Sequence, residues 1–156
     1  MTPEHVKTTI AALHASYRYK ADGGLQSWRF MRPDAKGLHH GDCEDFVLTA
    51  MADAFGSRWA ALRAIMAGDA RLYRTHHNGG PHIVGEIDAT AENSKAVALR
   101  FDNSGRVLPR EEFMQLEGYT VWEPLSRWTV LFQVVRLWIA GALFGGAALG
   151  LLAWAW

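Results

Sequence analysis

The chain has a single cysteine, Cys43, and therefore lacks the second thiol that an internal disulfide requires. It also lacks net charge, because 16 lysines and arginines balance 16 aspartates and glutamates. This balance excludes a strongly basic nucleic-acid-binding protein, since no overall positive field would attract phosphates. A disordered acidic tail is excluded as well, because 49% of the residues are hydrophobic. The length of 156 residues is enough for one hydrophobic core, and we expect no nucleic acid among the partners.

Charge is absent from the C-terminal end of the chain. Residues 137–156, LWIAGALFGGAALGLLAWAW, contain neither acids nor bases. A helix of this length would span about 30 Å, which matches the hydrocarbon core of a bilayer. Tryptophans near both ends favour the two membrane interfaces. We therefore predict a single-pass C-terminal membrane helix, with residues 1–127 as the folded domain and residues 128–156 as the span and its flank. A buried C-terminal helix in a soluble fold is the alternative.

The residues around and within this segment indicate its orientation and its packing. Arg127 and Arg136 precede the span and no charge follows it, so the positive-inside tendency predicts a cytoplasmic domain. The cell envelope or a virion is the alternative location. The charged residues near the N-terminus interrupt any run long enough for an export signal. Two pairs of glycines spaced four apart predict self-association through close helix contact. They are Gly141, Gly145, Gly146 and Gly150.

Two helices are predicted in the first third of the chain. Thr2 and Pro3 begin the first helix, and its apolar face is formed by Val6, Ile10, Leu13 and Tyr17. A loop follows around residues 21–24. The second helix covers residues 42–55, has a stripe of apolar residues from position 46 to position 54, and ends at Gly56. The next segment, residues 59–66, fits either a helix or a strand.

Strands are predicted in the remainder of the domain. Residues 76–81, HHNGGP, have the composition of a loop. Residues 82–87 and 95–101 are two predicted strands, which are separated by a polar turn. Residues 107–109 look extended, and Pro109 begins a predicted short helix through Leu116.

Cys43 lies at the first turn of the second predicted helix, within the sequence Gly-Asp-Cys-Glu-Asp-Phe at residues 41–46. Unpaired N–H groups and the helix dipole stabilise an anion at this position, so the pKa of the thiol tends to fall. The three neighbouring acids have the opposite effect. Cys43 could therefore be a nucleophile or a small residue that fills the interface between the helix and the core.

Two further residues fit a nucleophilic role for Cys43. His82 opens one predicted strand, and Asp102 ends the next one. Adjacent antiparallel strands would hold an imidazole and a carboxylate side by side. In a Cys–His–Asp triad, the histidine accepts the thiol proton and the aspartate orients the imidazole. Histidines at strand starts are also frequent as structural residues.

The order of these motifs resembles the bacterial transglutaminase-like cysteine proteinases, a family that includes a periplasmic protease releasing biofilm adhesins. The resemblance rests on residues 19–22, Trp28, the sequence at residues 41–46, a histidine before a strand, and Phe101-Asp102-Asn103. It implies an α+β, papain-like fold with the cysteine helix packed on an antiparallel sheet. It also implies Cys43 as the nucleophile, His82 as the general base and acid, and Asp102 as the orienting carboxylate.

The resemblance further implies a calcium ion at the acids that flank the cysteine, Asp42 and Glu44. Carboxylate oxygens suit calcium, and a cation would offset the negative charge that opposes a thiolate. Alternatively, Asp42 caps the helix and Glu44 and Asp45 interact favourably with its dipole. For the oxyanion, the Cys43 N–H is the first candidate donor, and Gln26 and Trp28 are candidates for the second.

Two functions follow as hypotheses. The first is a membrane-anchored cysteine peptidase that hydrolyses a protein substrate at or near the bilayer through an acyl-enzyme. Transamidation through the same intermediate is not distinguished from hydrolysis. The second is a catalytically idle domain on a membrane anchor, which serves as a structural or interaction subunit of a membrane or virion assembly.

Overall fold

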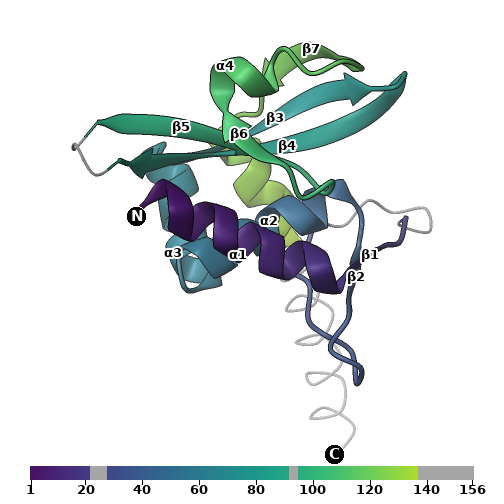
Figure 1. The fold of residues 1–156 in the computed structure, drawn as a ribbon. Coiled ribbons are helices and arrows are strands. Elements are labelled where there is room, and N and C mark those ends of the chain that lie inside the picture. The colour runs from purple at the N-terminus through teal and green to yellow at the C-terminus, as the bar shows by residue number, and fades with distance from the viewer. Residues whose placement is uncertain (22–27, 92–94, 137–156) are drawn as a thin grey trace, which may run out of the picture.

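The computed structural model describes residues 1–21, 28–91 and 95–136 as a mixed α/β fold (Figure 1). Four helices and seven strands have defined bounds within these residues. In chain order they are α1 (Pro3–Ser16), β1 (Tyr17–Tyr19), β2 (His39–Gly41), α2 (Cys43–Ala54), α3 (Arg58–Ala67), β3 (Ala70–His77), β4 (Gly80–Thr90), β5 (Ala96–Phe101), β6 (Val107–Pro109), α4 (Arg110–Phe113) and β7 (Tyr119–Pro124). Residues 59–66, which the sequence left undecided, lie in a helix.

The main sheet is antiparallel and has the strand order β6-β5-β4-β3-β7. Helices α1, α2 and α3 lie on one side of it, and α4 lies on the other side (Figure 1). Helix α2 packs on β4, where Gly85 allows the close approach: a Cβ at this glycine would lie 2.9 Å from Val47 Cγ1. The expected arrangement, with the cysteine-bearing helix on an antiparallel sheet, is confirmed. Strands β1 and β2 form a separate parallel pair.

Capping residues set the helix bounds much as the sequence predicts. Thr2 accepts a hydrogen bond from the N–H of His5 and begins α1, and Asp42 accepts one from the N–H of Asp45 and begins α2. Helix α1 ends at Ser16, before Tyr17, which was predicted to lie on its apolar face. Tyr17 leaves the helix for β1, although its ring remains buried and its hydroxyl donates to the Gly41 carbonyl.

The predicted loop at residues 76–81 is wrong. Strands β3 and β4 run through most of it and pair from Ala70↔Ile87 to His77↔Gly80, which leaves Asn78 and Gly79 as a two-residue turn. Both turn residues have positive φ, 51° and 81°, as a tight hairpin turn requires. His76 and His77 lie in β3 despite their polarity, because pairing with β4 provides hydrogen-bond partners for the backbone of this segment.

The segment after β5 also differs in part from the prediction. Strand β6 is extended as expected, but α4 ends at Phe113, three residues before the predicted end at Leu116. Strand β7 was not predicted, and it completes the sheet beside β3. Tyr119 on β7 forms a small second apolar cluster with Phe113 and Val84.

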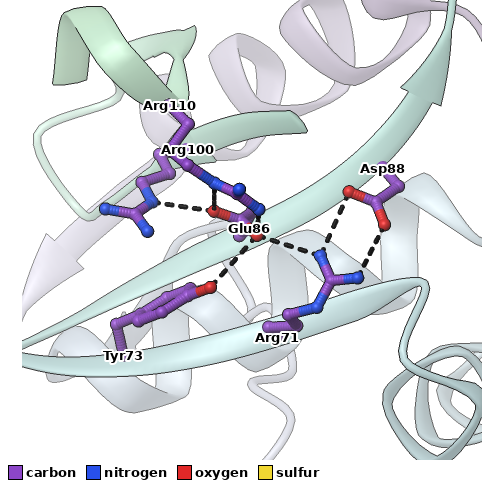
Figure 2. A network of polar contacts seen from close by, with 6 residues as sticks. All are labelled: Arg71, Tyr73, Glu86, Asp88, Arg100 and Arg110. Atoms are coloured by element: carbon purple, nitrogen blue, oxygen red, sulfur yellow. Dashed lines mark hydrogen bonds and ion pairs between the residues drawn. The ribbon is translucent and has the colours of Figure 1, made fainter. Parts of the chain in front are cut away.

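The buried carboxylate of Glu86 on β4 links this strand to β3, β5 and α4 (Figure 2). Glu86 is fully buried and accepts hydrogen bonds from Arg71, Arg100 and Arg110 and from the Tyr73 hydroxyl. Burial alone would raise the pKa of Glu86, but the hydrogen bonds and charges of Arg110 and Arg100 outweigh burial and lower it to about 2. The Arg100 guanidinium also lies over the Tyr73 ring, 4.2 Å from its centroid.

Residues 127–136 are helical, and Val130 and Val134 on this segment join the main core. The predicted membrane span at 137–156, its four glycines and the loop at 22–24 lie outside the described residues. Among the residues that the structure describes, no helix is long and apolar enough to cross a bilayer.

Candidate functional site

The candidate site lies where β4 runs on beyond the end of β5. Strand β5 pairs with β4 only from Gly85↔Phe101 onward, so in the described part of the chain residues 80–84 of β4 have no strand partner on that side. His82 lies on this unpaired stretch, and Asp102 follows the last residue of β5. The two strands therefore bring the histidine and the aspartate together, as their order along the chain predicts.

His82 and Asp102 form a direct hydrogen-bonded pair. The distance from His82 Nε2 to Asp102 Oδ2 is 2.9 Å, and the Asp102 side chain is only 1% exposed. The backbone N–H and the hydroxyl of Ser104 donate to the other carboxylate oxygen, at 3.0 and 2.6 Å. The Tyr119 hydroxyl donates to Oδ2. With four donors directed at it, the carboxylate is held in one orientation.

These donors determine the charge of the aspartate. Burial alone would raise the pKa of Asp102, but the hydrogen bonds from His82, Ser104 and Tyr119 outweigh it and lower the pKa to about 2. Asp102 is therefore ionised at neutral pH. Because its oxygen faces Nε2, the hydrogen bond favours the tautomer of His82 that is protonated at Nε2, and Nδ1 is the nitrogen left to act as a base.

An aromatic cluster beside the pair was not predicted from the sequence. The Tyr119 ring stacks on His77 with a centroid distance of 4.3 Å, and the His77 and His82 rings lie 5.6 Å apart. The available sequence signal was weak: Asn78-Gly79 is a hairpin turn sequence, and a hairpin there would place His77 near His82. The contact of Tyr119 depends on β7, which the sequence did not reveal.

Cys43 is the first residue of α2, and it approaches the same strand edge. Its sulfur is within hydrogen-bonding reach of the backbone N–H of Ile83, the residue after His82. The thiol itself donates to Glu44 Oε2 at 3.0 Å. Within the described part of the chain, no hydrogen bond joins Cys43 to the His82 ring. The structure thus brings all three predicted residues to one edge and links two of them directly.

The pKa of the Cys43 thiol is raised, not lowered as its helix position suggested. Burial is the main cause, and the negative charge and hydrogen bond of Glu44 add to it, while the Ile83 N–H has the opposite effect. The expected influence of the helix N-terminus is therefore outweighed. The thiol is protonated at neutral pH in this arrangement.

The acids around Cys43 mostly have structural partners. Asp42 caps α2, and Asp45 accepts hydrogen bonds from the backbone and the guanidinium of Arg29. The Glu44 carboxylate is buried and accepts the hydrogen bond from the Cys43 thiol. Across residues 1–21, 28–91 and 95–136, no three acidic, histidine or cysteine side chains converge in a way that could hold a metal ion. The donors described do not by themselves assemble a calcium site.

The remaining candidates lie elsewhere or have other partners. Trp28 is buried in the core, and Gln26 lies outside the described residues. The histidines before the motif are part of β2. His39 Nδ1 lies 2.9 Å from the Ser16 hydroxyl, and His40 pairs with Asp34 at 3.1 Å.

No protein-family model matches the chain, and no curated protein matches it. The solved structures with a partly similar fold include two of LapG from Legionella pneumophila, one of them calcium-bound. The first is 14% identical with a TM-score of 0.46, and the match covers 78% of this chain and 60% of that one. The calcium-bound structure is 14% identical with a TM-score of 0.47, and the match covers 83% of this chain and 78% of that one. A likeness of this extent carries no information about activity or ligands.

Proposed function

We propose that the chain is a cysteine peptidase with a transglutaminase-like fold, which cleaves a peptide bond through an acyl-enzyme on Cys43. The proposal is supported above all by the pairing of His82 with a buried, firmly held Asp102 at the strand edge that the start of α2 also reaches. Ser104 and Tyr119 hold the carboxylate that faces His82 Nε2, and a fixed carboxylate in this place suits the orientation of a catalytic imidazole. The apolar segment at 137–156 would tether the domain to a bilayer and restrict it to substrates at or near that membrane.

In the proposed reaction, Nδ1 of His82 accepts the Cys43 thiol proton and the sulfur attacks the substrate carbonyl carbon. The Cys43 N–H, at the first position of α2, has no intrahelical acceptor and donates to the oxyanion. The imidazolium then protonates the leaving amine, and a thioester remains. Water, deprotonated by His82, hydrolyses the thioester and restores the thiol. Asp102 orients the ring and stabilises the imidazolium throughout.

The thiol must leave Glu44 before this sequence begins. The hydrogen bond to Glu44 and the raised pKa describe a resting state in which Cys43 is protonated. Rotation of the Cys43 side chain toward the unpaired edge of β4 would exchange Glu44 for His82. The catalytic form is thus a second side-chain arrangement of the same backbone.

The same resting state favours a second candidate function. A cysteine whose thiolate is disfavoured by burial and by an adjacent carboxylate suits an idle domain that acts as a structural or interaction subunit. A thiol-reactive electrophile distinguishes the two functions. Labelling of Cys43 that depends on His82 supports the peptidase, and labelling no faster than that of a free thiol supports the idle domain.

The deciding experiment compares new protein N-termini in native membranes that contain the wild-type chain or a variant. Cys43→Ala and His82→Ala should both abolish a common set of cleavage products. His76→Ala is the matched control, because His76 is an exposed histidine on the neighbouring strand. Identical N-termini with Cys43→Ala would rule out the peptidase. Incorporation of a labelled amine into membrane proteins would assign transamidation in place of hydrolysis.

Calcium at Asp42 and Glu44 remains a prediction, and no step above is assigned to a cation. Thermal unfolding of the full chain tests it. Stabilisation by calcium, not by magnesium, that is lost in Glu44→Gln would support the site. The absence of a calcium-dependent change in melting temperature would remove calcium from the proposal.

A further inference from the structure

A cavity lies away from the Cys43 site. It has a volume of about 680 Å³, within the range of roughly 300–1,000 Å³ that is usual for ligand pockets. Its walls come from the loop at residues 28–32, from the start of α3 and from residues 134–135. None of the three proposed triad residues lines it, so this pocket is separate from the proposed peptidase site.

The walls of this pocket are mainly apolar, and the charged groups that the described residues contribute to it are positive. Trp28, Phe30 and Leu62 provide apolar surface, whereas three arginines provide charge. One of them, Arg29, is ion-paired with Asp45, and the other two are Arg32 and Arg58. Among the described residues that line it, none is acidic. In the described ranges, neither Arg32 nor Arg58 forms an ion pair with an acid; Arg58 instead lies 5.7 Å from the centroid of the Phe30 ring. Apolar walls beside uncompensated arginines suit an anionic amphiphile.

The first turn of α3 adds to this preference for an anion. Ser57 caps the helix, and no acidic residue lies in its first turn. The N–H groups of Arg58 and Trp59 precede the first intrahelical hydrogen bonds, and the positive end of the helix dipole lies at this end. A phosphate is a suitable acceptor for such groups. Asp53 lines a neighbouring cavity with Arg58 but forms no ion pair with it.

The position of the pocket relative to the apolar segment indicates the source of the anion. Val134 and Val135 line it, and the uncharged stretch starts at residue 137. Three large apolar side chains near this part of the chain are exposed: Trp59 (72%), Trp128 (63%) and Phe132 (60%). Exposed tryptophans of this kind favour the membrane interface. If residues 137–156 enter a bilayer, as the proposed function holds, the pocket lies close to the lipid headgroups.

We infer that this pocket binds one acidic phospholipid of the bilayer. The phosphate is held by Arg32, Arg58 and the first turn of α3, and one acyl chain lies along Trp28, Phe30 and Leu62. A free phosphate would leave the apolar walls exposed to water, and a zwitterionic lipid would bring a cation close to the arginines. The inference shares the membrane anchor with the proposed function and is independent of its chemistry.

Quenching of tryptophan fluorescence tests the inference with the full chain in detergent micelles. Phosphatidylglycerol with brominated acyl chains should quench the tryptophans of the pocket at lower concentration than brominated phosphatidylcholine does. Removing one arginine near an anionic lipid should weaken binding by about fivefold. Arg32→Gln and Arg58→Gln should each lower the affinity for phosphatidylglycerol by this factor, and the two losses in binding free energy should add in the double variant. Arg63→Gln is the matched control, because Arg63 is an exposed arginine of α3 outside the pocket.

Four results would overturn the inference. They are equal quenching by the two lipids, an equal loss of binding in Arg63→Gln, displacement of phosphatidylglycerol by excess inorganic phosphate, and a lack of quenching by either lipid. Cys43→Ala should bind the lipid like the wild type. Loss of peptidase activity and loss of lipid binding are therefore separate outcomes.

Discussion

Replacing Glu86 with glutamine removes the carboxylate that Arg71, Arg100 and Arg110 share, and two estimates of the resulting loss of stability agree. The pKa of Glu86 falls from 4.5 to about 2 on folding, which corresponds to about 3 kcal/mol of folding free energy above about pH 5. Breaking a buried ion pair by removing one partner costs roughly 3–5 kcal/mol. For a domain of this size, such a loss lowers the melting temperature by about 10 °C.

The measurement is thermal unfolding of the full chain, followed by tryptophan fluorescence. Because the pKa of Glu86 is lower in the folded state, its contribution is present above the unfolded pKa and is lost as the pH falls through the folded pKa. The difference in melting temperature between the wild type and Glu86→Gln should therefore shrink as the pH falls from about 5 toward about 2. Glu112→Gln is the matched control, since Glu112 is an exposed glutamate on α4. If the melting temperature of Glu86→Gln fell no further than that of Glu112→Gln, the reasoning would be refuted.

Three further substitutions test individual contacts. Glu44→Gln removes the negative charge that helps to raise the pKa of Cys43 and leaves a weaker, neutral acceptor for the thiol, so alkylation of the thiol by iodoacetamide at mildly alkaline pH should become several-fold faster. Tyr119→Phe removes one of the donors to Asp102 and should cost about 2 kcal/mol in thermal unfolding. Val121→Gly should stabilise the fold by up to about 1 kcal/mol, because a β-branched residue is strained at its φ of 60°.

Each of these substitutions has a control elsewhere in the chain. Asp34→Asn, an exposed acid, should leave the alkylation rate of the thiol unchanged. Tyr19→Phe removes an exposed hydroxyl and should not change stability. Thr120→Gly, next to Val121 in β7 but without a positive φ, should destabilise. Slower alkylation in Glu44→Gln, an unchanged melting temperature in Tyr119→Phe, or a lower one in Val121→Gly would contradict the corresponding prediction.

The parts of the fold that the sequence predicts well are those that short-range signals determine. Asp42 at the cap and Gly56 after the last turn delimit α2, and a stripe of apolar residues indicates its buried face. The pairing of His82 with Asp102 also follows from the sequence, because consecutive strands joined by a short turn are neighbours in the sheet.

The parts that the sequence misses depend on distant partners. Strand β3 has few apolar residues at alternate positions. Its strand character comes from pairing with β4 and β7, and that of β7 comes from pairing with β3. Burial of the Cys43 thiol against Glu44 likewise depends on how α2 packs on the sheet. The helix dipole alone predicted the opposite direction for the pKa of the thiol.

The hydrogen bond from Cys43 to Glu44 also affects how the protein responds to oxidants. Peroxides react with the thiolate form of cysteine. Because the buried Cys43 thiol donates a hydrogen bond to a carboxylate and has a raised pKa, only a small fraction of it is thiolate. The sole cysteine should therefore resist conversion to the sulfenic acid in the resting state. In the arrangement that the proposed reaction requires, with the thiol beside His82, Cys43 would become sensitive to peroxide. The rate of inactivation by peroxide, measured with and without a bound substrate, would therefore report which arrangement the side chain occupies.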